Sequence, residues 1–511
     1  MVDDTLFLKA AAQILRDPLR PYDFVVNWYG TSESFWNVFK NPPGVSYWLA
    51  GAHALGAASD VARHVTMLPF AVAALLGGVR LARRFVEDAG WATTMWAASP
   101  AFVLGAATLM ADVPALAFSL WGLALWTEGV DAADPGRRRL GALLTGIAIM
   151  MKYTAILAVG ALALYIFVAR EHRRGLFDLW VGVLPGLAWG LLNFATMERV
   201  HVIDALVVGG GALAPNSGWF GHRAVALMTF VAGVAITPVV LAVAARFDRR
   251  VLVIAGVAVG LGIAAAVVTP WLWSPRGLTT FTQAGVAVFG FAGAFVVLAA
   301  LDEGRTDRDG RFLALWLVLH IAYLWFWSWT IAARFLLPAL VPLVFLLARR
   351  IERDRGERAV RSFAVAASVA LLSAFALVRA DSFAGEIYRR AIPAVAAQAR
   401  SEGRKVYFVG AWGFQHYAEA AGFERLDAGG SAPPPGVLVL QPYYAGNNEL
   451  PPPLIPRLRQ VADLPAPAPP LDLHTMNINV GAGYHASAFG PLPFVRAHLP
   501  AEGIKVWLVV R

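Results

Sequence analysis

The sequence predicts an all-α polytopic membrane protein of about 12 transmembrane helices, followed by a small α/β domain at the C-terminus outside the membrane. Three observations lead to this fold class. The 511 residues are 58% hydrophobic and only 15% charged. Long apolar segments fill residues 64–379. The short loops between these segments alternate between arginine-rich and arginine-poor. A chain surrounded by lipid must satisfy its backbone groups internally, and helices do so.

The distribution of arginine predicts how the chain is oriented. Six loops hold 21 arginines, within residues 80–84, 137–139, 170–174, 246–250, 305–311 and 349–361. The intervening loops hold only Lys152, Arg199, Arg223, Arg276 and Arg334. Cytoplasmic loops retain Lys and Arg. We therefore expect the arginine-rich loops in the cytoplasm and the five isolated cations on the opposite side of a bacterial inner (plasma) membrane.

The apolar segments predict three regions. Residues 1–62 form an outer loop with juxtamembrane helices, among them residues 5–15 and an interfacial helix at 45–58, which is too short to cross a bilayer. Residues 63–380 form the transmembrane domain. Its spans are expected at 64–84, 91–109, 113–129, 138–151, 153–169, 177–195, 223–245, 251–269, 278–300, 312–329, 335–348 and 361–379. No span precedes the outer loop to carry it across, so we expect that a first transmembrane helix is missing from this chain.

Residues 381–511 differ in composition and predict a soluble extracytoplasmic domain. Proline is dense between Pro433 and Pro470. Three β-type runs lie at 406–409, 437–440 and 506–510, and residues 384–400 have the spacing of an amphipathic helix. The mixture of short strands and one helix favours a small α/β fold.

Composition also excludes several kinds of site. The chain has no cysteine, which rules out disulfides, zinc–thiolate centres and cysteine nucleophiles. The net charge of +9 is concentrated in the arginine-rich loops, so it indicates orientation and contact with anionic lipid rather than nucleic-acid binding.

Three carboxylates on the outer side are candidates for a site. Asp3 and Asp4 open the chain, and Asp112 precedes Pro114 between two apolar spans. Each has a simple structural alternative, because acidic residues cap and stabilise helix N-termini. Ionisable groups at such membrane positions also mark functional sites. The same three side chains offer the oxygen ligands of a divalent cation, although we expect neither a metal nor a cofactor.

The few outer cations complete the candidate site. Lys152 lies between two spans, Arg334 begins the segment Arg334-Phe335-Leu336-Leu337-Pro338, and Arg63 precedes the first span. Snorkelling to the interface is the alternative explanation for Lys152. Arg binds phosphate oxygens through a planar fork and Lys acts as a point charge. Tyr47, after Pro42-Pro43, is placed to anchor at lipid headgroups or to stack on a sugar.

In their order and sidedness these residues resemble the C-type membrane glycosyltransferases, in particular the protein O-mannosyltransferase and lipid A aminoarabinose transferase branch. The resemblance covers roughly residues 1–350. The run Gly410-Ala411-Trp412-Gly413-Phe414-Gln415-His416-Tyr417 is similar to extracytoplasmic tails of bacterial members. The family pattern often has His or Lys directly before the Pro-Pro pair, whereas this chain has Asn41, with Lys40 one step away.

The resemblance implies a role for each matching position. Asp3 matches the catalytic base, and Asp4 and Asp112 match the other outer-loop carboxylates. Lys152 matches the lysine near the lipid phosphate, and Arg63 and Arg334 match arginines at the edge of the site. The implied reaction is an inverting transfer of a sugar from a polyprenyl-phosphate donor to a hydroxyl of a lipid, glycan or protein at the outer face of the membrane.

Two other functions remain open at the level of sequence. A transporter or flippase of lipid-linked glycans would share the spans and the outer charges, but it should carry charges or broken helices near mid-membrane. The centres of these spans are mostly Ala, Val, Leu and Gly. A polymerase or ligase of lipid-linked glycans would share the donor chemistry.

Overall fold

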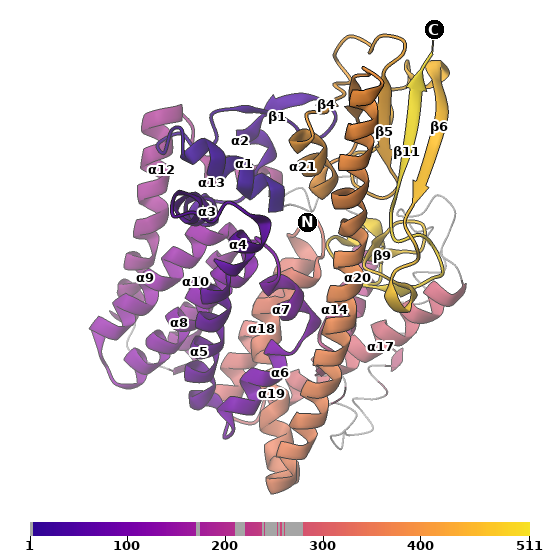
Figure 1. Ribbon diagram of the computed structural model, residues 1–511. Helices are drawn as coiled ribbons and strands as arrows, with labels where there is room; N and C mark the ends of the chain where they lie inside the picture. The colour runs from indigo at the N-terminus through magenta and orange to yellow at the C-terminus, as the bar shows by residue number, and fades with distance from the viewer. Residues whose placement is uncertain are drawn as a thin grey trace.

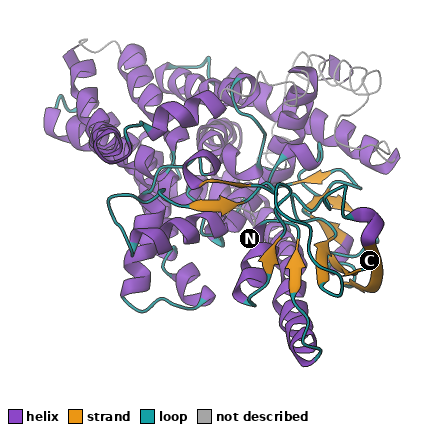
Figure 2. Cartoon of the chain, turned by 90° about the horizontal axis from the view of Figure 1, so that it is seen from above, coloured by secondary structure: helices purple, strands orange, loops and turns teal. Residues whose placement is uncertain are grey.

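The computed structural model describes residues 4–169, 174–209, 220–237 and 280–510, with isolated positions between 240 and 260. Helices dominate the bundle and strands gather in the tail (Figure 1). Seen from above, the strands of the tail lie to one side of the helices (Figure 2). The expected span at 251–269 falls largely outside the described residues.

The N-terminal region is a set of short elements at the upper end of the bundle (Figure 1). Its elements are α1 (Asp4–Ile14), β1 (Val25–Asn27), β2 (Ser32–Ser34), α2 (Phe35–Val38), α3 (Gly44–Ala54) and α4 (Asp60–Val65). Helix α1 is the expected helix at 5–15, and α3 is the expected interfacial helix at 45–58. Strands β1 and β2 form an antiparallel pair.

The bundle follows with longer helices. They are α5 (Leu68–Phe85), α6 (Ala89–Ala97), α7 (Pro100–Ala106), α8 (Asp112–Asp131), α9 (Pro135–Met151), α10 (Ile156–Ala169), α11 (Arg174–Phe177), α12 (Leu184–Met197), α13 (His201–Gly209), α14 (Phe220–Val234), α17 (Thr280–Glu303), α18 (Arg308–Phe326), α19 (Leu337–Arg355) and α20 (Ala359–Ser401). Among the described residues, six helices are long and apolar enough to cross a membrane, and two shorter apolar helices accompany them. The protein is therefore a polytopic membrane protein.

The expected number of spans is not confirmed. The segment expected to span at 91–109 is divided into α6 and α7, because the Ser99 side chain caps a new helix and Pro100 occupies its first turn. The last expected span, 361–379, continues without a break into the expected tail helix, so that α20 is 43 residues long. The boundary expected at 380/381 thus lies inside a continuous helix.

Arginine-bearing helix ends meet at the lower end of the bundle (Figure 1). Arg84 at the end of α5 pairs with Asp131 at the end of α8 and with Asp309 at the start of α18, at 2.6 Å each. Arg353 of α19 pairs with Glu303 of α17 at 2.6 Å. Three of the arginine-rich loops, at 80–84, 305–311 and 349–361, are therefore close together in space, whereas the loops at 170–174 and 246–250 fall largely outside the described residues. The tail lies toward the opposite end.

Helices α8 and α9 pack closely against each other at Gly122 and Gly141. A Cβ added at Gly141 would lie 2.7 Å from the Gly122 carbonyl oxygen and 2.8 Å from the Trp126 nitrogen. Small residues allow such close approach of membrane helices.

We expect Gly141→Val to destabilise the detergent-solubilised protein by about 1–3 kcal/mol, measured as a lower melting temperature. Gly186→Val in α12 is the matched control, because nothing lies within 4 Å of its added Cβ. Equal shifts for the two variants would contradict this packing.

The tail is built on a five-stranded sheet that packs against the upper part of α20. The strand order is β4-β3-β5-β11-β6, with β3 parallel to β4 and β5, and β11 antiparallel to β5 and β6. The elements are β3 (Val406–Phe408), α21 (Trp412–Ala420), β4 (Glu424–Arg425), β5 (Leu438–Pro442), β6 (Leu458–Pro465), β7 (Leu473–His474), β8 (Met476–Asn477), β9 (Ala482–Gly483), β10 (Val495–Arg496) and β11 (Gly503–Val509). The three expected strands correspond to β3, β5 and β11.

A buried acid beside β11 makes the stability of the tail depend on pH. Burial raises the pKa of Glu502 from its ordinary value of 4.5 to about 7. The folded state then binds the proton more tightly than the unfolded state. The contribution of this tighter proton binding to the stability of the folded state is complete below about pH 4.5. It is lost as the pH rises through about 7, which changes the free energy of unfolding by about 3 kcal/mol.

We therefore expect amide hydrogen exchange in β11 to be slower at pH 5 than at pH 8, after correction for the intrinsic exchange rate. Glu502→Gln cannot titrate, so it should remove the difference between the two pH values. The same pH dependence in Glu502→Gln as in the wild type would assign the effect to another group.

Candidate active site

Three polar side chains meet where four helices begin or end. Asp112 is the first residue of α8, directly after the cap residue Ala111. Lys152 lies between α9 and α10 in an extended conformation, with φ −153° and ψ 125°, which interrupts the two helices. Arg334 lies in a short 3-10 turn, Ala333–Leu336, directly before α19. Each side chain therefore projects from a break in regular structure, and the three breaks face one another.

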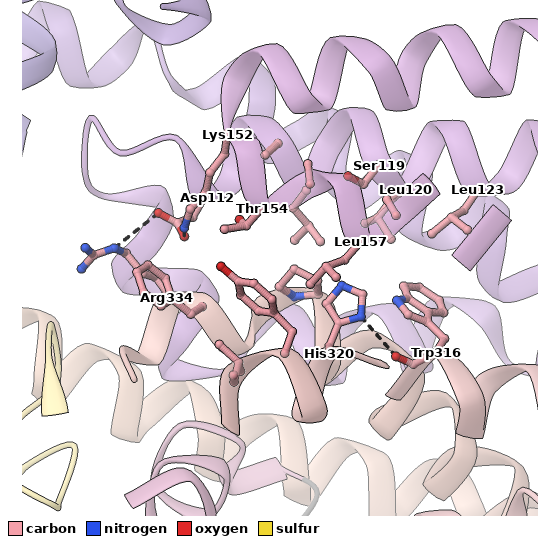
Figure 3. Close-up of a pocket in the computed structure, with 18 residues that line it drawn as sticks. Asp112, Ser119, Leu120, Leu123, Lys152, Thr154, Leu157, Trp316, His320 and Arg334 are labelled. Carbon is pink, nitrogen blue, oxygen red and sulfur yellow. Dashed lines mark hydrogen bonds and ion pairs between the residues drawn. The ribbon is translucent and has the colours of Figure 1, made fainter. Parts of the chain in front are cut away.

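These side chains form an ion-paired cluster, which we call the triad (Figure 3). The Lys152 Nζ donates to Asp112 Oδ1 at 2.5 Å, and the Arg334 Nε lies 3.5 Å from Asp112 Oδ2. The three side chains are only 11%, 5% and 11% exposed for Lys152, Asp112 and Arg334. A carboxylate this buried requires a charged partner. Asp112 lies in the first turn of α8, where a carboxylate also favours the helix N-terminus, and Lys152 pairs with this carboxylate.

The ring of Phe335 completes the cluster. Lys152 Nζ lies 4.0 Å from the centre of this ring, and the Arg334 guanidinium carbon lies 5.0 Å from it. Cations are attracted to aromatic faces. Two positive groups therefore share one carboxylate and one ring, which leaves the triad with a net positive charge.

The triad forms the charged end of an elongated cavity whose remaining wall is mostly apolar, with Ser119, Thr154, His320 and Tyr323 as its other polar side chains. Figure 3 shows the labelled triad at one end and the leucines with Trp316 at the other. The cavity wall includes Leu116, Leu120 and Leu123 of α8 and Leu157 of α10. Residues 112, 116, 120 and 123 recur every three or four positions and so lie on one face of α8. The cavity thus combines a cationic end with a mostly apolar interior.

Helix α18 contributes a second face that the sequence analysis did not single out. Trp316, His320 and Tyr323 lie four and three residues apart and all line the cavity. The His320 Nδ1 lies 3.1 Å from the Trp316 carbonyl oxygen. The spacing of four and three residues is the signal that could have revealed these three positions in the sequence, because they share one face of a helix.

The structure describes only one of the two N-terminal acids. Asp3 lies outside the described residues. Asp4, the first residue of α1, is 2% exposed, and its Oδ1 accepts a hydrogen bond from the Leu109 N–H at 2.8 Å. Leu109 precedes Asp112 by three residues, so the start of the described chain reaches the turn that carries Asp112.

The structure does not place Arg63 or Tyr47 on the wall of this cavity. Arg63 lies on α4 and pairs with Asp60 at 3.3 Å, one helical turn away. The Tyr47 hydroxyl donates to the Pro18 carbonyl oxygen. Each side chain thus has a local partner that accounts for its position, and their expected phosphate or sugar contacts stay predictions.

A metal centre is not evident in the part of the chain that the structure describes. No group of three or more His, Asp or Glu side chains there is arranged to hold an ion. Asp112 is occupied by two cationic side chains instead.

The fold and the site together define a polytopic membrane protein with a cationic site at one end of an apolar cavity. Residues 40–197 match the family model of dolichyl-phosphate-mannose-protein mannosyltransferases. The matched segment contains Asp112 and Lys152 and ends before Arg334. Over this segment the comparison therefore confirms the resemblance to the protein O-mannosyltransferase branch that the order of the motifs indicates.

Two solved structures are similar to this chain at low identity. They are ArnT from Cupriavidus metallidurans bound to undecaprenyl phosphate, with a TM-score of 0.41, and the same protein in the apo state, with a TM-score of 0.35. Each is 15% identical, and each alignment covers 86% of this chain and 88% of the other. None of the curated proteins compared matches the sequence significantly.

Proposed function

We propose that the protein is a membrane glycosyltransferase that moves a sugar from a polyprenyl-phosphate donor to a hydroxyl acceptor, with inversion at the sugar. The reaction takes place at the outer, periplasmic face of a bacterial inner membrane. Residues 63–380 form the transmembrane catalytic domain, residues 1–62 form an outer loop above it, and residues 381–511 form a domain on the same outer side.

The observation that carries this proposal is the position of the triad at one end of an apolar cavity. A polyprenyl phosphate has the same two parts, an anionic head and a long hydrocarbon chain. Lys152 and Arg334 match the head, since both bind phosphate oxygens. Leu120, Leu123 and Leu157 match the chain. The match to a family described by its dolichyl-phosphate-linked donor points to the same class of substrate.

The chemistry is a single displacement. The acceptor hydroxyl gives its proton to the carboxylate of Asp3, its oxygen forms a bond to the anomeric carbon, and the bond from that carbon to the phosphate oxygen breaks. The bonding electrons leave with the phosphate. Sugar transfer passes through an oxocarbenium-like state, and negative charge grows on the leaving phosphate.

The cations act on this developing charge. Both cations pair with Asp112, so this carboxylate holds Lys152 and Arg334 together at the end of the cavity. Preorganised charges of this kind stabilise a transition state without reorganising during the reaction. Asp4 and Asp112 are thus supporting carboxylates, while Arg63 and Tyr47 are kept as candidates for the edge of the site.

The test compares a deletion strain of the source cell with its parent by mass spectrometry of lipid-linked and surface glycans. We expect the polyprenyl-phosphate sugar to accumulate and one glycan, lipid or protein to lose the mass of a single sugar. Re-expression of the full chain should reverse both changes. If a lipid-linked glycan is instead trapped intact on the cytoplasmic side, the protein is a flippase and the proposal is wrong.

A further inference from the structure

A second cavity lies outside the bundle, between α20 and the tail. Its wall includes Asp381 and Tyr388 of α20, Trp412 of α21, and Tyr444, His485 and Glu502 of the tail. Figure 1 shows β9 beside the middle of α20, where this part of the tail meets the helix. Two tyrosines and a tryptophan, together with two histidines and two acids, line this cavity, which is an unusual gathering for a simple domain contact.

Both acids of this cavity are satisfied by groups of the protein itself. Asp381 Oδ1 accepts from the Thr475 hydroxyl at 2.7 Å and lies 2.9 Å from His485 Nε2. Glu502 Oε1 accepts from the backbone N–H groups of Tyr443, Tyr444 and Gly503, each at 2.9 Å. The Tyr388 hydroxyl donates to the other oxygen of Glu502. Because these bonds fix the carboxylates, the wall is rigid and polar but disfavours an anionic ligand.

The aromatic wall is held in place at a cost in backbone energy. Trp412 has φ 63°, in the left-handed region, although it has a side chain. Such a residue costs on the order of 1–3 kcal/mol and is found at functional sites. A Cβ added at Gly446 would lie 2.7 Å from the Trp412 ring, so a glycine there gives the ring its space. Trp412 belongs to the run 410–417 that the sequence analysis singled out.

This cavity is linked to the donor site by backbone hydrogen bonds, although the two cavities have no lining residue in common. The His485 side chain lines the second cavity, while its carbonyl oxygen accepts from Arg334 Nη1 at 3.2 Å. The Ala333 N–H donates to the Tyr484 carbonyl oxygen at 2.9 Å, and the Ser487 N–H donates to the Ile331 carbonyl oxygen at 2.7 Å. The tail segment 484–487 therefore runs beside the segment that leads to Arg334.

We propose that the second cavity is the acceptor site and that it binds an uncharged carbohydrate, with a sugar face against Trp412 and Tyr444. This inference rests on the proposed transfer function. Ligand pockets combine aromatic walls with a few fixed polar groups that set orientation. A sugar ring can stack on the aromatic side chains, and its hydroxyl groups match the polar wall of Asp381, Thr475 and His485. His485 joins this site to the proposed donor site, because its side chain lines the acceptor cavity and its carbonyl oxygen accepts from Arg334.

The experiment uses the full-length protein in the deletion strain, complemented with single variants. Trp412→Leu removes the stacking surface, and we expect it to lower the fraction of acceptor that carries the added sugar by about tenfold. Thr475→Val is nearly isosteric and removes one polar group, so a smaller loss is expected. Trp507→Leu is the matched control, because Trp507 lies in β11 and does not line the cavity.

A second measurement separates an acceptor site from a folding defect. Polyprenyl phosphate should raise the melting temperature of purified Trp412→Leu as much as that of the wild type, since the donor cavity is untouched. In membranes, Trp412→Leu should raise the acceptor concentration needed for half-maximal transfer and leave the donor concentration unchanged.

The outcomes distinguish this inference from the function on which it rests. If wild-type protein restores no transfer, the proposed function fails. If transfer occurs but Trp412→Leu matches the wild type, the acceptor site lies elsewhere. An acceptor that proves to be a protein side chain or a phosphate group would also overturn the inference, as would equal losses for Trp412→Leu and Trp507→Leu.

Discussion

Replacing Lys152 with methionine is expected to lower the rate of sugar transfer about 10²–10³-fold, the loss typical when one group that stabilises developing charge is removed. Methionine keeps most of the apolar length of the side chain and removes only the charge. Asp112 keeps its contact with Arg334 in this variant, so the triad is reduced rather than abolished. The rate is measured with saturating lipid donor, where a defect in donor binding alone would disappear.

The same kind of ion pair elsewhere on the protein provides the control. Lys9 of α1 pairs with Glu419 of the tail at 2.5 Å, the distance found between Lys152 and Asp112. This pair is more exposed, at 24% and 37% for the two side chains, and neither residue lines the donor cavity. Lys9→Met should leave the rate unchanged. A wild-type rate in Lys152→Met, or equal losses in the two variants, would remove Lys152 from the reaction.

The sequence named Asp112, Lys152 and Arg334 within a larger set of candidates, because isolated charges are rare among apolar spans and because the family resemblance marks these positions. Lys152 and Arg334 stand out against the arginine-rich loops on the other side, and Asp112 stands out between two apolar segments. A charge at such a place must find a partner, so three of them on one side predict a cluster. Sequence spacing does not show which atoms of the triad pair with one another. It also does not show that Arg63 and Tyr47 have local partners, because both depend on the geometry of the side chains.

Other features could not be predicted from local sequence patterns. Arg334 and His485 are 151 positions apart, and no periodicity links them. The break between α6 and α7 depends on a single serine cap before Pro100, whereas hydropathy averages over the whole segment and predicts one span. Helix α20 shows the opposite error, because the sequence predicts an end of the span near residue 380 and the helix continues to Ser401.

The acid at the start of the chain carries the second large prediction. Asp3→Asn is expected to reduce transfer about 10²–10⁴-fold, the usual contribution of general acid–base catalysis. Asparagine keeps the shape of the side chain but cannot accept the proton of the acceptor hydroxyl. Binding of the lipid donor should be unchanged, because the cations of the triad are intact.

Asp4→Asn separates the base from its neighbour. The Asp4 Oδ1 accepts from the Leu109 N–H at 2.8 Å, and the amide oxygen of asparagine can accept the same bond. The loss in Asp4→Asn should therefore be much smaller than in Asp3→Asn if Asp3 is the base. A larger loss in Asp4→Asn would assign proton abstraction to Asp4, and unchanged turnover in both variants would exclude the pair. Because a carboxylate base must be ionised, the rate of the wild type should also fall at low pH, and that fall should be absent from the residual activity of the variant that lacks the base.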